Sequence, residues 1–209
     1  MNQEPQPAQK THTTAALFIA ILFLFLAGTL FFGKWLVYHR PAPDVVTYNG
    51  FVFNKTVDGW TTLWQYNKQV YEIGLRYNPQ ELENVSVDGT LNATLFNQQH
   101  VYLTFDPNLK ENYKYEALTM AELGVNFKRG LGRTINISCT TNETEQEACK
   151  QVRPITCADI DKPVILVNAV GVPSISMMNN CILLQGQDMT ILQAADKLLY
   201  MFYGIINTK

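Results

Sequence analysis

The apolar stretch from Ala15 to Val37 most constrains how this chain folds. Twelve residues between Ala15 and Gly33 are Leu, Ile or Phe, and no Asp, Glu, Lys or Arg occurs between Lys10 and Lys34. A helix of this length extends about 34 Å, enough to cross a hydrocarbon core of about 30 Å. At about −0.3 to −0.6 kcal/mol each, the twelve side chains favour insertion by about 4 to 7 kcal/mol. The stretch predicts a transmembrane helix over residues 15–38, and its uniformly apolar surface argues against a buried helix of a soluble domain.

The flanks of this helix favour a retained signal anchor over a cleaved signal peptide. Signal-peptide cores are about 7 to 15 residues long and end at a small-x-small site. Here the run is longer, and the small residues Ala27 and Gly28 are followed by further Leu and Phe. Lys10 on one side and Lys34 and Arg40 on the other nearly balance the positive-inside count. The orientation must therefore be inferred from the rest of the chain.

Three further segments follow from composition. Residues 1–14 are polar and rich in Gln, Pro and Thr, which predicts a disordered cytoplasmic tail. Pro41 and Pro43 prevent helix continuation and predict a juxtamembrane spacer over residues 39–47. The remaining residues, 48–209, are enough for one domain with its own core.

The first half of this domain has the composition of short strands joined by tight turns. β-branched and aromatic residues alternate with turn formers, and breaks are predicted at Asp58-Gly59, Tyr66-Asn67, Asn78-Pro79 and Asp88-Gly89. Residues 60–65 and 69–77 predict a hairpin around Asn67-Lys68. A further strand is predicted from His100 to Phe105.

The second half adds two helices and several strands. Apolar residues at helical spacing predict a helix from Tyr113 to Phe127. Strands are predicted at 134–139, 164–167 and 181–185, with an exposed loop at 140–150. Asp188 is expected to cap a last helix whose polar face carries Gln193, Asp196 and Lys197. The prediction is an α+β domain with a single mixed sheet and about two packed helices.

Four cysteines, Cys139, Cys149, Cys157 and Cys181, all follow the membrane segment. An even count in a domain after a membrane anchor predicts two disulfides in an oxidising compartment. Buried free thiols and a metal site remain as alternatives, although no C-x-x-C pair is present. Three pairings are open. Cys139–Cys149 with Cys157–Cys181 is favoured, because the first closes a short polar loop and the second would join two neighbouring strands.

Five N-x-[ST] sequons lie on the same side of the membrane segment as the cysteines. They begin at Asn54, Asn84, Asn92, Asn136 and Asn142. Each alone is more often a turn asparagine. Together with the cysteines they predict a glycosylated domain outside the cytoplasm, with the amino terminus inside.

Catalytic and ligand-binding motifs are scarce. His100 is the one histidine of the domain and is expected to be an ordinary surface or core residue. Five carboxylates are candidates for acid–base chemistry: Glu81, Glu83, Asp106, Asp159 and Asp161. The favoured interpretation is that they are ordinary solvated residues of loops and turns. From Pro41 onward the chain has 13 Lys and Arg (16 minus 3) and 17 Asp and Glu (18 minus 1). This net negative charge argues against a nucleic-acid partner. The sequence predicts no cofactor and no metal ion.

Several phrases of the domain resemble a group of membrane-anchored envelope proteins from small-genome archaea of the DPANN type. They are the YNGF phrase at 48–51, LRYNP at 75–79, YLTFDP at 102–107, NCI at 180–182 and the segment from Ala194 to Ile205. The resemblance covers most of the chain beyond the anchor. It implies an anchored envelope protein with paired cysteines and implies no activity.

These observations favour a single-pass envelope protein whose outer domain has a structural or interaction role. Its expected partners are the lipid bilayer and either another envelope protein or a second copy of the chain. A carboxylate-dependent hydrolase of cell-surface glycans is one alternative. A subunit of a surface filament or membrane complex is the other.

Overall fold

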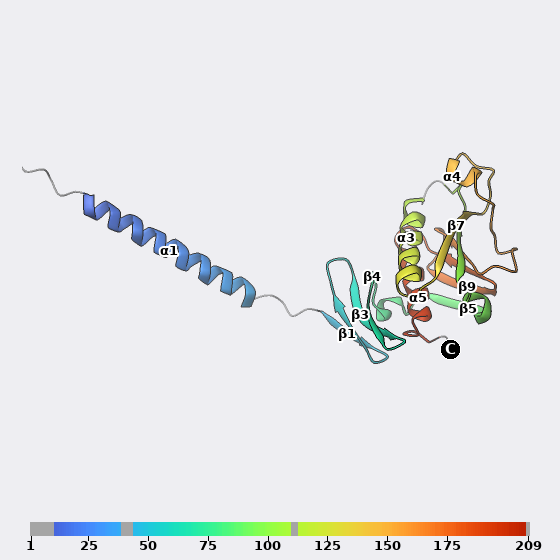
Figure 1. The fold of residues 1–209 in the computed structure, drawn as a ribbon, viewed down its shortest axis with the longest axis horizontal. Coiled ribbons are helices and arrows are strands. Elements are labelled where there is room, and N and C mark those ends of the chain that lie inside the picture. Colours follow the sequence, from blue (N-terminus) through green and yellow to red (C-terminus); the bar gives the residue numbers. More distant parts are fainter. Residues whose placement is uncertain (1–10, 39–43, 110–112, 208–209) are drawn as a thin grey trace, which may run out of the picture. The chain divides into compact units, whose positions relative to one another are not determined.

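A computed structural model describes residues 11–38, 44–109 and 113–207, and divides the chain into two units, 1–43 and 44–209 (Figure 1). The first unit contains helix α1 (Thr11–Tyr38). Its side chains from Leu17 to Trp35 are exposed, and within the described residues it is the helix long and apolar enough to cross a membrane. It begins at Thr11, so the last four residues of the predicted tail are helical. The rest of that tail, and residues 39–43 of the predicted spacer, lie outside the described residues.

The second unit begins four residues earlier than predicted, because Val45 to Thr47 of the predicted spacer form a strand. These residues pair with β2 as part of β1. The first sheet is an antiparallel meander in the order β1-β2-β3-β4. Its strands are β1 (Val45–Tyr48), β2 (Phe51–Lys55), β3 (Trp60–Tyr66) and β4 (Gln69–Leu75).

Two of the tight turns in this meander use positive backbone φ angles. Asn49 and Gly50 join β1 to β2 at φ +47° and +82°, and Asn67 and Lys68 join β3 to β4 at +48° and +68°. Positive φ at both central residues twists the turn in the sense that hairpin strands require. The hairpin predicted around Asn67-Lys68 is confirmed, with Trp60 opposite Leu75 and Tyr66 opposite Gln69.

The second sheet has six strands in the order β5-β9-β10-β8-β6-β7. Neighbours pair in parallel except β9 and β10. The domain is α+β as predicted, but the prediction of a single sheet is wrong, because β1 to β4 pair only with each other among the described strands. The break predicted at Asp88-Gly89 is also wrong, since both residues lie inside β5. The strands are β5 (Ser86–Leu91), β6 (His100–Phe105), β7 (Thr134–Cys139), β8 (Val164–Asn168), β9 (Ser174–Asn179) and β10 (Cys181–Gln185).

Two long helices, α3 (Tyr113–Arg129) and α5 (Thr190–Phe202), confirm the two predicted ones. Short helices are η1 (Pro79–Leu82), α2 (Ala93–Phe96) and α4 (Glu147–Lys150), so the loop predicted at 140–150 ends in a helical turn. The prediction that Asp188 caps α5 is wrong. Asp188 has φ +53° and turns the chain, and Met189 precedes the helix without a side-chain cap.

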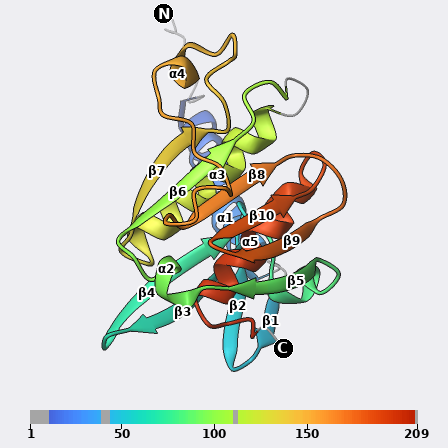
Figure 2. The same cartoon turned by 90° about the vertical axis from the view of Figure 1, so that its right-hand side faces the viewer.

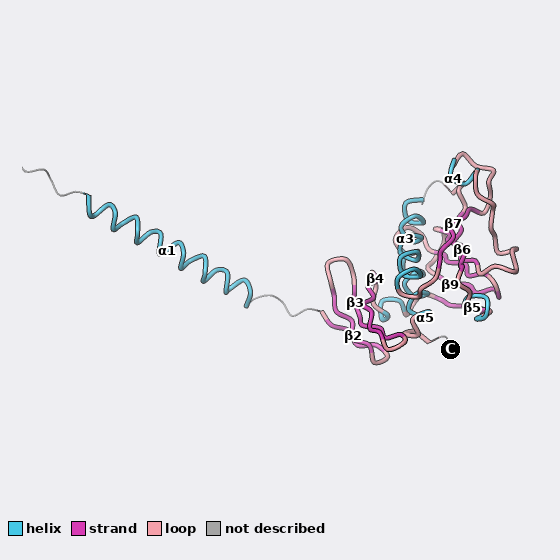
Figure 3. The backbone as a smooth tube through the Cα atoms, in the orientation of Figure 1, coloured by secondary structure: helices cyan, strands magenta, loops and turns pink. Residues whose placement is uncertain are grey.

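Helices α3 and α5 pack on one face of the six-stranded sheet, between it and the meander (Figures 2 and 3). Sheet residues such as Leu103 and Ile182 meet them in the main core. The meander packs on α5 through Trp64, whose ring lies 4.9 Å from that of Tyr203 and whose Nε1 donates to the Tyr203 carbonyl at 2.9 Å. The opposite face of the large sheet carries a small separate core around Ile155.

Candidate functional site

The carboxylates singled out in the sequence serve local structure. Glu81 accepts the backbone N–H of Asn78 at 2.8 Å, in the capping box of η1, and Glu83 is the residue after that helical turn. Asp106 accepts the N–H of Asn108 at 2.9 Å, which closes a turn after β6. In these turns Glu81 and Asp106 replace missing backbone partners, as capping residues do.

Asp159 and Asp161 lie in the loop before β8, and both contact Lys162. Lys162 Nζ is 3.4 Å from Asp159 Oδ1 and 3.2 Å from Asp161 Oδ1. The N–H of Thr156 donates to Asp159 and, with Lys162, lowers the pKa of that carboxyl. His100 is exposed at the start of β6, with Nδ1 3.3 Å from Asn136 Nδ2.

A buried charge cluster that the sequence did not suggest joins β4, α3 and α5. Asp196 on α5 is fully buried, and its Oδ2 accepts the N–H of Tyr77 at 2.9 Å. Glu122 on α3, with 12% of its side chain exposed, accepts from Arg76 Nε at 2.9 Å. The Asp196 and Glu122 carboxyl groups lie within hydrogen-bonding reach of each other. The cluster therefore fastens the end of β4 to both core helices.

The surroundings of one carboxyl group in this cluster, Asp196, favour its protonated form. Ionised carboxylates only accept hydrogen bonds, so Oδ1 of Asp196 has no donor until one group of the pair is protonated. Burial, and then the charge of Glu122, raise the pKa of Asp196 well above its ordinary value, and the Tyr77 and Arg76 N–H groups offset this only partly. Burial beside Glu122 therefore favours the protonated form of Asp196.

A cleft of about 310 Å³ opens beside this cluster, lined by Arg76, Glu122, Trp60 and Asp58 among others. Asp196 is not in its wall. Glycosidases place two carboxyl groups about 5 to 10 Å apart across the scissile bond. Here Asp58 and Glu122 both line the cleft, but Glu122 is already paired with Arg76. The arrangement favours a structural role, in which the two carboxyl groups hold the end of β4 against α3 and α5, over acid–base catalysis on a glycan.

A second buried carboxyl group has a similar role. Glu116 on α3 is fully buried and accepts the N–H of Ala169, just after β8, at 3.2 Å. Its other oxygen, Oε2, has no donor. Burial, with a smaller contribution from Asp106, raises the pKa of Glu116. Glu116 on α3 and Asp196 on α5 thus each hold the chain just beyond a strand.

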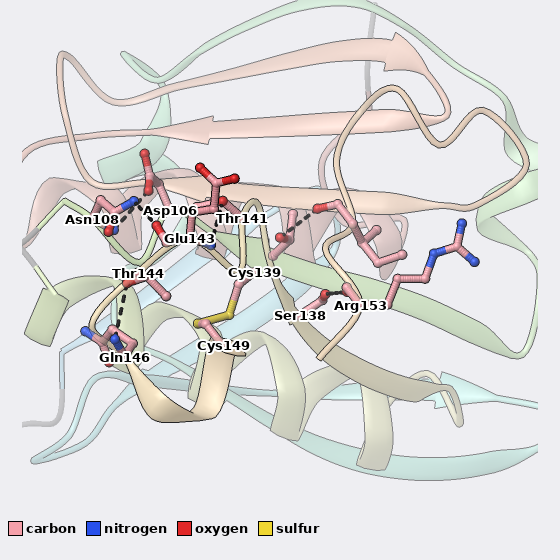
Figure 4. Close-up of a disulfide and its surroundings, with 12 residues drawn as sticks. Asp106, Asn108, Ser138, Cys139, Thr141, Glu143, Thr144, Gln146, Cys149 and Arg153 are labelled. Carbon is pink, nitrogen blue, oxygen red and sulfur yellow. Dashed lines mark hydrogen bonds between the residues drawn. A yellow bond between two sulfur atoms is a disulfide. The ribbon is translucent and has the colours of Figure 1, made fainter. Parts of the chain in front are cut away.

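The four cysteines form the pairs Cys139–Cys149 and Cys157–Cys181, the pairing that sequence spacing favoured. Their Cα atoms are 5.7 and 5.2 Å apart, within the range of disulfides. The first joins the end of β7 to α4 (Figure 4). The second joins β10 to the loop before β8. The expectation that it ties two strands is therefore wrong, because Cys157 lies in a turn.

The five sequon asparagines differ in exposure. Asn54, Asn84 and Asn142 are exposed. Asn92 is half-buried, and its Oδ1 accepts the N–H groups of Thr94 and Leu95 at the start of α2. Asn136 is also half-buried, on β7. The first three side chains are thus open to modification, whereas the other two already serve local hydrogen bonds.

An apolar groove of about 460 Å³ lies beside the Cys139–Cys149 disulfide. Its walls come from the exposed flank of α3, from β7 and from the segment around α4, and they include Ala117, Ala121, Ile137 and Cys149. Ile137, in the wall of this groove, is 62% exposed. A groove of this size and apolar character is typical of a binding site.

The sequence did contain a signal for the buried cluster. Asp196 was expected on the polar face of the last helix, but Leu192, Leu199 and Tyr200 lie one helical turn away on either side and are buried. This spacing places Asp196 inside the apolar stripe. Glu122 gave no such signal, because its partner Arg76, just after β4, lies 46 residues away in the sequence. Among the described residues no three His, Cys, Asp or Glu side chains converge as metal ligands.

Comparison of the chain with family models, with curated proteins and with solved structures yields no match.

Proposed function

We propose that the protein is a single-pass membrane protein whose outer domain, from Asp44 onward, binds another component of the cell envelope. The observation that carries the binding role is the apolar groove beside β7, with its exposed Ile137. An isolated domain gains stability by covering such a surface, so a groove left open on a folded domain favours a ligand or partner.

The two disulfides and the apolar helix support the outer location. Disulfides persist in oxidising compartments, and both fall in the unit that follows α1. Exposure of Asn54, Asn84 and Asn142 fits the same side of the membrane. With the domain outside and α1 retained as the anchor, the amino terminus lies in the cytoplasm.

A glycan hydrolase has less support. Five carboxylates were candidates for its active site. Of these, Glu81 and Asp106 accept backbone hydrogen bonds within turns, and Asp159 and Asp161 contact Lys162. A subunit role in a filament or membrane complex is compatible with the groove, since such a subunit also needs a surface for its neighbours.

Protease treatment of intact cells or spheroplasts tests the location. A tag at the carboxyl terminus should be lost, and a tag at the amino terminus should survive until the membrane is opened. A carboxyl-terminal domain that is protected in intact cells would rule out the proposal.

A further inference from the structure

The groove beside β7 lies next to an open sheet edge. β7 is the last strand of the six-stranded sheet and pairs in parallel with β6. The N–H of Thr134 donates to Gln99 and that of Thr140 to Phe105. In a parallel ladder these bonds alternate along the strand. The even-numbered residues of β7 therefore face β6, and Ile135 and Ile137 point their N–H and C=O groups outward.

The outward groups of Ile135 and Ile137 have no backbone partner within the described residues, whereas both ends of the edge are closed. Arg133 N–H donates to the Phe127 carbonyl before the strand, and the outward carbonyl of Cys139 accepts from Ile155 N–H at 3.0 Å. At Cys139 the edge is thus already bonded to the backbone of a loop residue. Two outward residues, with four backbone groups, remain for another chain.

Nothing on β7 discourages such pairing. Natural sheets protect their edges with charges, proline or irregular backbone. The other edge strand, β5, carries exposed Asp88 and has Gly89 at φ +88°. β7 reads TINISC, without charge, proline or glycine, and its regular register runs unbroken from Thr134 to Cys139.

The groove beside this edge can hold the side chains of an added strand. Side chains alternate across a strand, and Ile135 and Ile137 share the α3 side of the sheet with their partners Val101 and Leu103. Ala117 and Ala121 of α3 line the same groove as Ile137. A chain lying beside β7 would place alternate side chains against these alanines, which leave room for medium-sized apolar groups.

Resting on the proposed binding function, we infer that β7 accepts an extended segment of a partner protein as an added strand, with alternating apolar side chains filling the groove. The short length of the open edge selects this occupant: two outward residues, closed at both ends, suit a short segment rather than a long strand of a second sheet. This is the strand-addition mode, in which backbone bonds give affinity and alternate pockets give specificity.

The test uses the full chain in phosphatidylcholine nanodiscs and fluorescein-labelled heptapeptides of sequence Lys-Thr-X-Thr-X-Thr-Lys, with X as Val, Ile or Leu. A matched control carries N-methyl groups on the three Thr and both X residues, which keeps the side chains but removes the inner N–H groups for either direction of the added strand. At least one heptapeptide should bind, and its N-methyl form should bind at least about tenfold more weakly. Hydrogen exchange should slow at the Ile135 and Ile137 amides when the peptide is bound.

Variants of the protein provide the reciprocal test. Ile137→Pro removes one outward N–H without touching the ladder to β6, and should weaken binding about tenfold. Ile137→Val should change it less than threefold, and circular dichroism should show both variants folded. Equal binding of the N-methyl peptides, unprotected Ile135 and Ile137 amides, or no binding of any heptapeptide at about 1 mM would overturn strand addition, whatever the location of the domain.

The remaining outcomes separate the occupants. Dimers in sedimentation that Ile137→Pro dissociates would make a second copy the occupant and overturn the partner-protein assignment. Peptide binding that shows the expected N-methyl effect, together with a protease-protected domain in cells, would leave strand addition standing and refute the proposed location.

Discussion

Replacing Asp196 tests its protonation in the buried cluster. Asp196→Asn keeps an oxygen to accept the Tyr77 N–H and supplies an amide N–H to the Glu122 carboxylate, so it needs no proton. Asp196→Ala leaves the Tyr77 N–H buried without an acceptor, which costs about 1 to 3 kcal/mol, and also leaves a cavity. At pH 6 we expect Ala to destabilise by about 2 to 4 kcal/mol and Asn by less than about 1 kcal/mol.

The pH dependence of this pair gives the sharper result. The folded pKa of Asp196 is raised above the unfolded value of about 3.9, so the folded state holds a proton that the unfolded state has lost. This contribution to stability is complete below the unfolded pKa and is lost as the pH rises through the folded pKa. The free energy of unfolding should then fall by up to about 1.4 kcal/mol per pH unit in the natural chain. Asp196→Asn should lack this slope and become the more stable protein at alkaline pH.

Chemical unfolding of the full chain in detergent micelles between pH 5 and 9, followed by tryptophan fluorescence, measures this difference. The two variants share every other titrating group, so subtracting their curves isolates Asp196. Parallel curves for Asp196→Asn and the natural chain would refute the protonation of Asp196. Equal destabilisation by Asn and Ala would refute the hydrogen-bond arrangement.

Three further results are expected. Replacing both Cys157 and Cys181 with serine should lower the free energy of unfolding by about 3 kcal/mol, because the bond closes a 24-residue separation; a change below about 1 kcal/mol in denaturant titration would contradict this. Trp64→Phe should cost about 1 to 3 kcal/mol by the same titration, since the Tyr203 carbonyl loses its indole donor and the ring shrinks, whereas a neutral result would mean that water replaces the indole. In a glycosylating secretion host, peptide mass spectrometry should find Asn54, Asn84 and Asn142 occupied more often than Asn92 and Asn136, and the reverse order would contradict the exposure argument.

Local features of the fold follow from the sequence where a single segment determines them. The hairpin at Asn67-Lys68 needs only a turn that accepts positive φ and two strands of alternating character. Helices α3 and α5 follow from the 3.6-residue spacing of their apolar positions. The cysteine pairing was favoured by the short loop between Cys139 and Cys149 and by an expected strand-to-strand link at Cys157–Cys181; the pairing is confirmed, although Cys157 lies in a turn.

Features that depend on distant partners did not follow. The sequence gives β5 no strong strand character, because SVDGTL carries Asp88 and Gly89, and it becomes a strand by pairing with β9 almost ninety residues later. The division into two sheets has the same cause: strand propensity does not specify which edges meet.

The candidate sites show the same division. Carboxylates chosen for their closeness in sequence, such as Asp159 and Asp161, serve a loop, whereas the carboxyl groups of the buried cluster join α3 to α5 across 74 residues, from Glu122 to Asp196. The β7 groove could not be predicted, since a strand is an edge only once all its neighbours are known.

The central claim is that the domain beyond α1 lies in an oxidising compartment outside the cytoplasm. Its most direct test traps the thiols of intact cells with acid and then labels them with a maleimide that adds mass, with and without prior reduction. The account predicts that none of Cys139, Cys149, Cys157 and Cys181 is labelled unless a reductant is added first. Full labelling without reductant would contradict it, and would place the domain in the reducing cytoplasm.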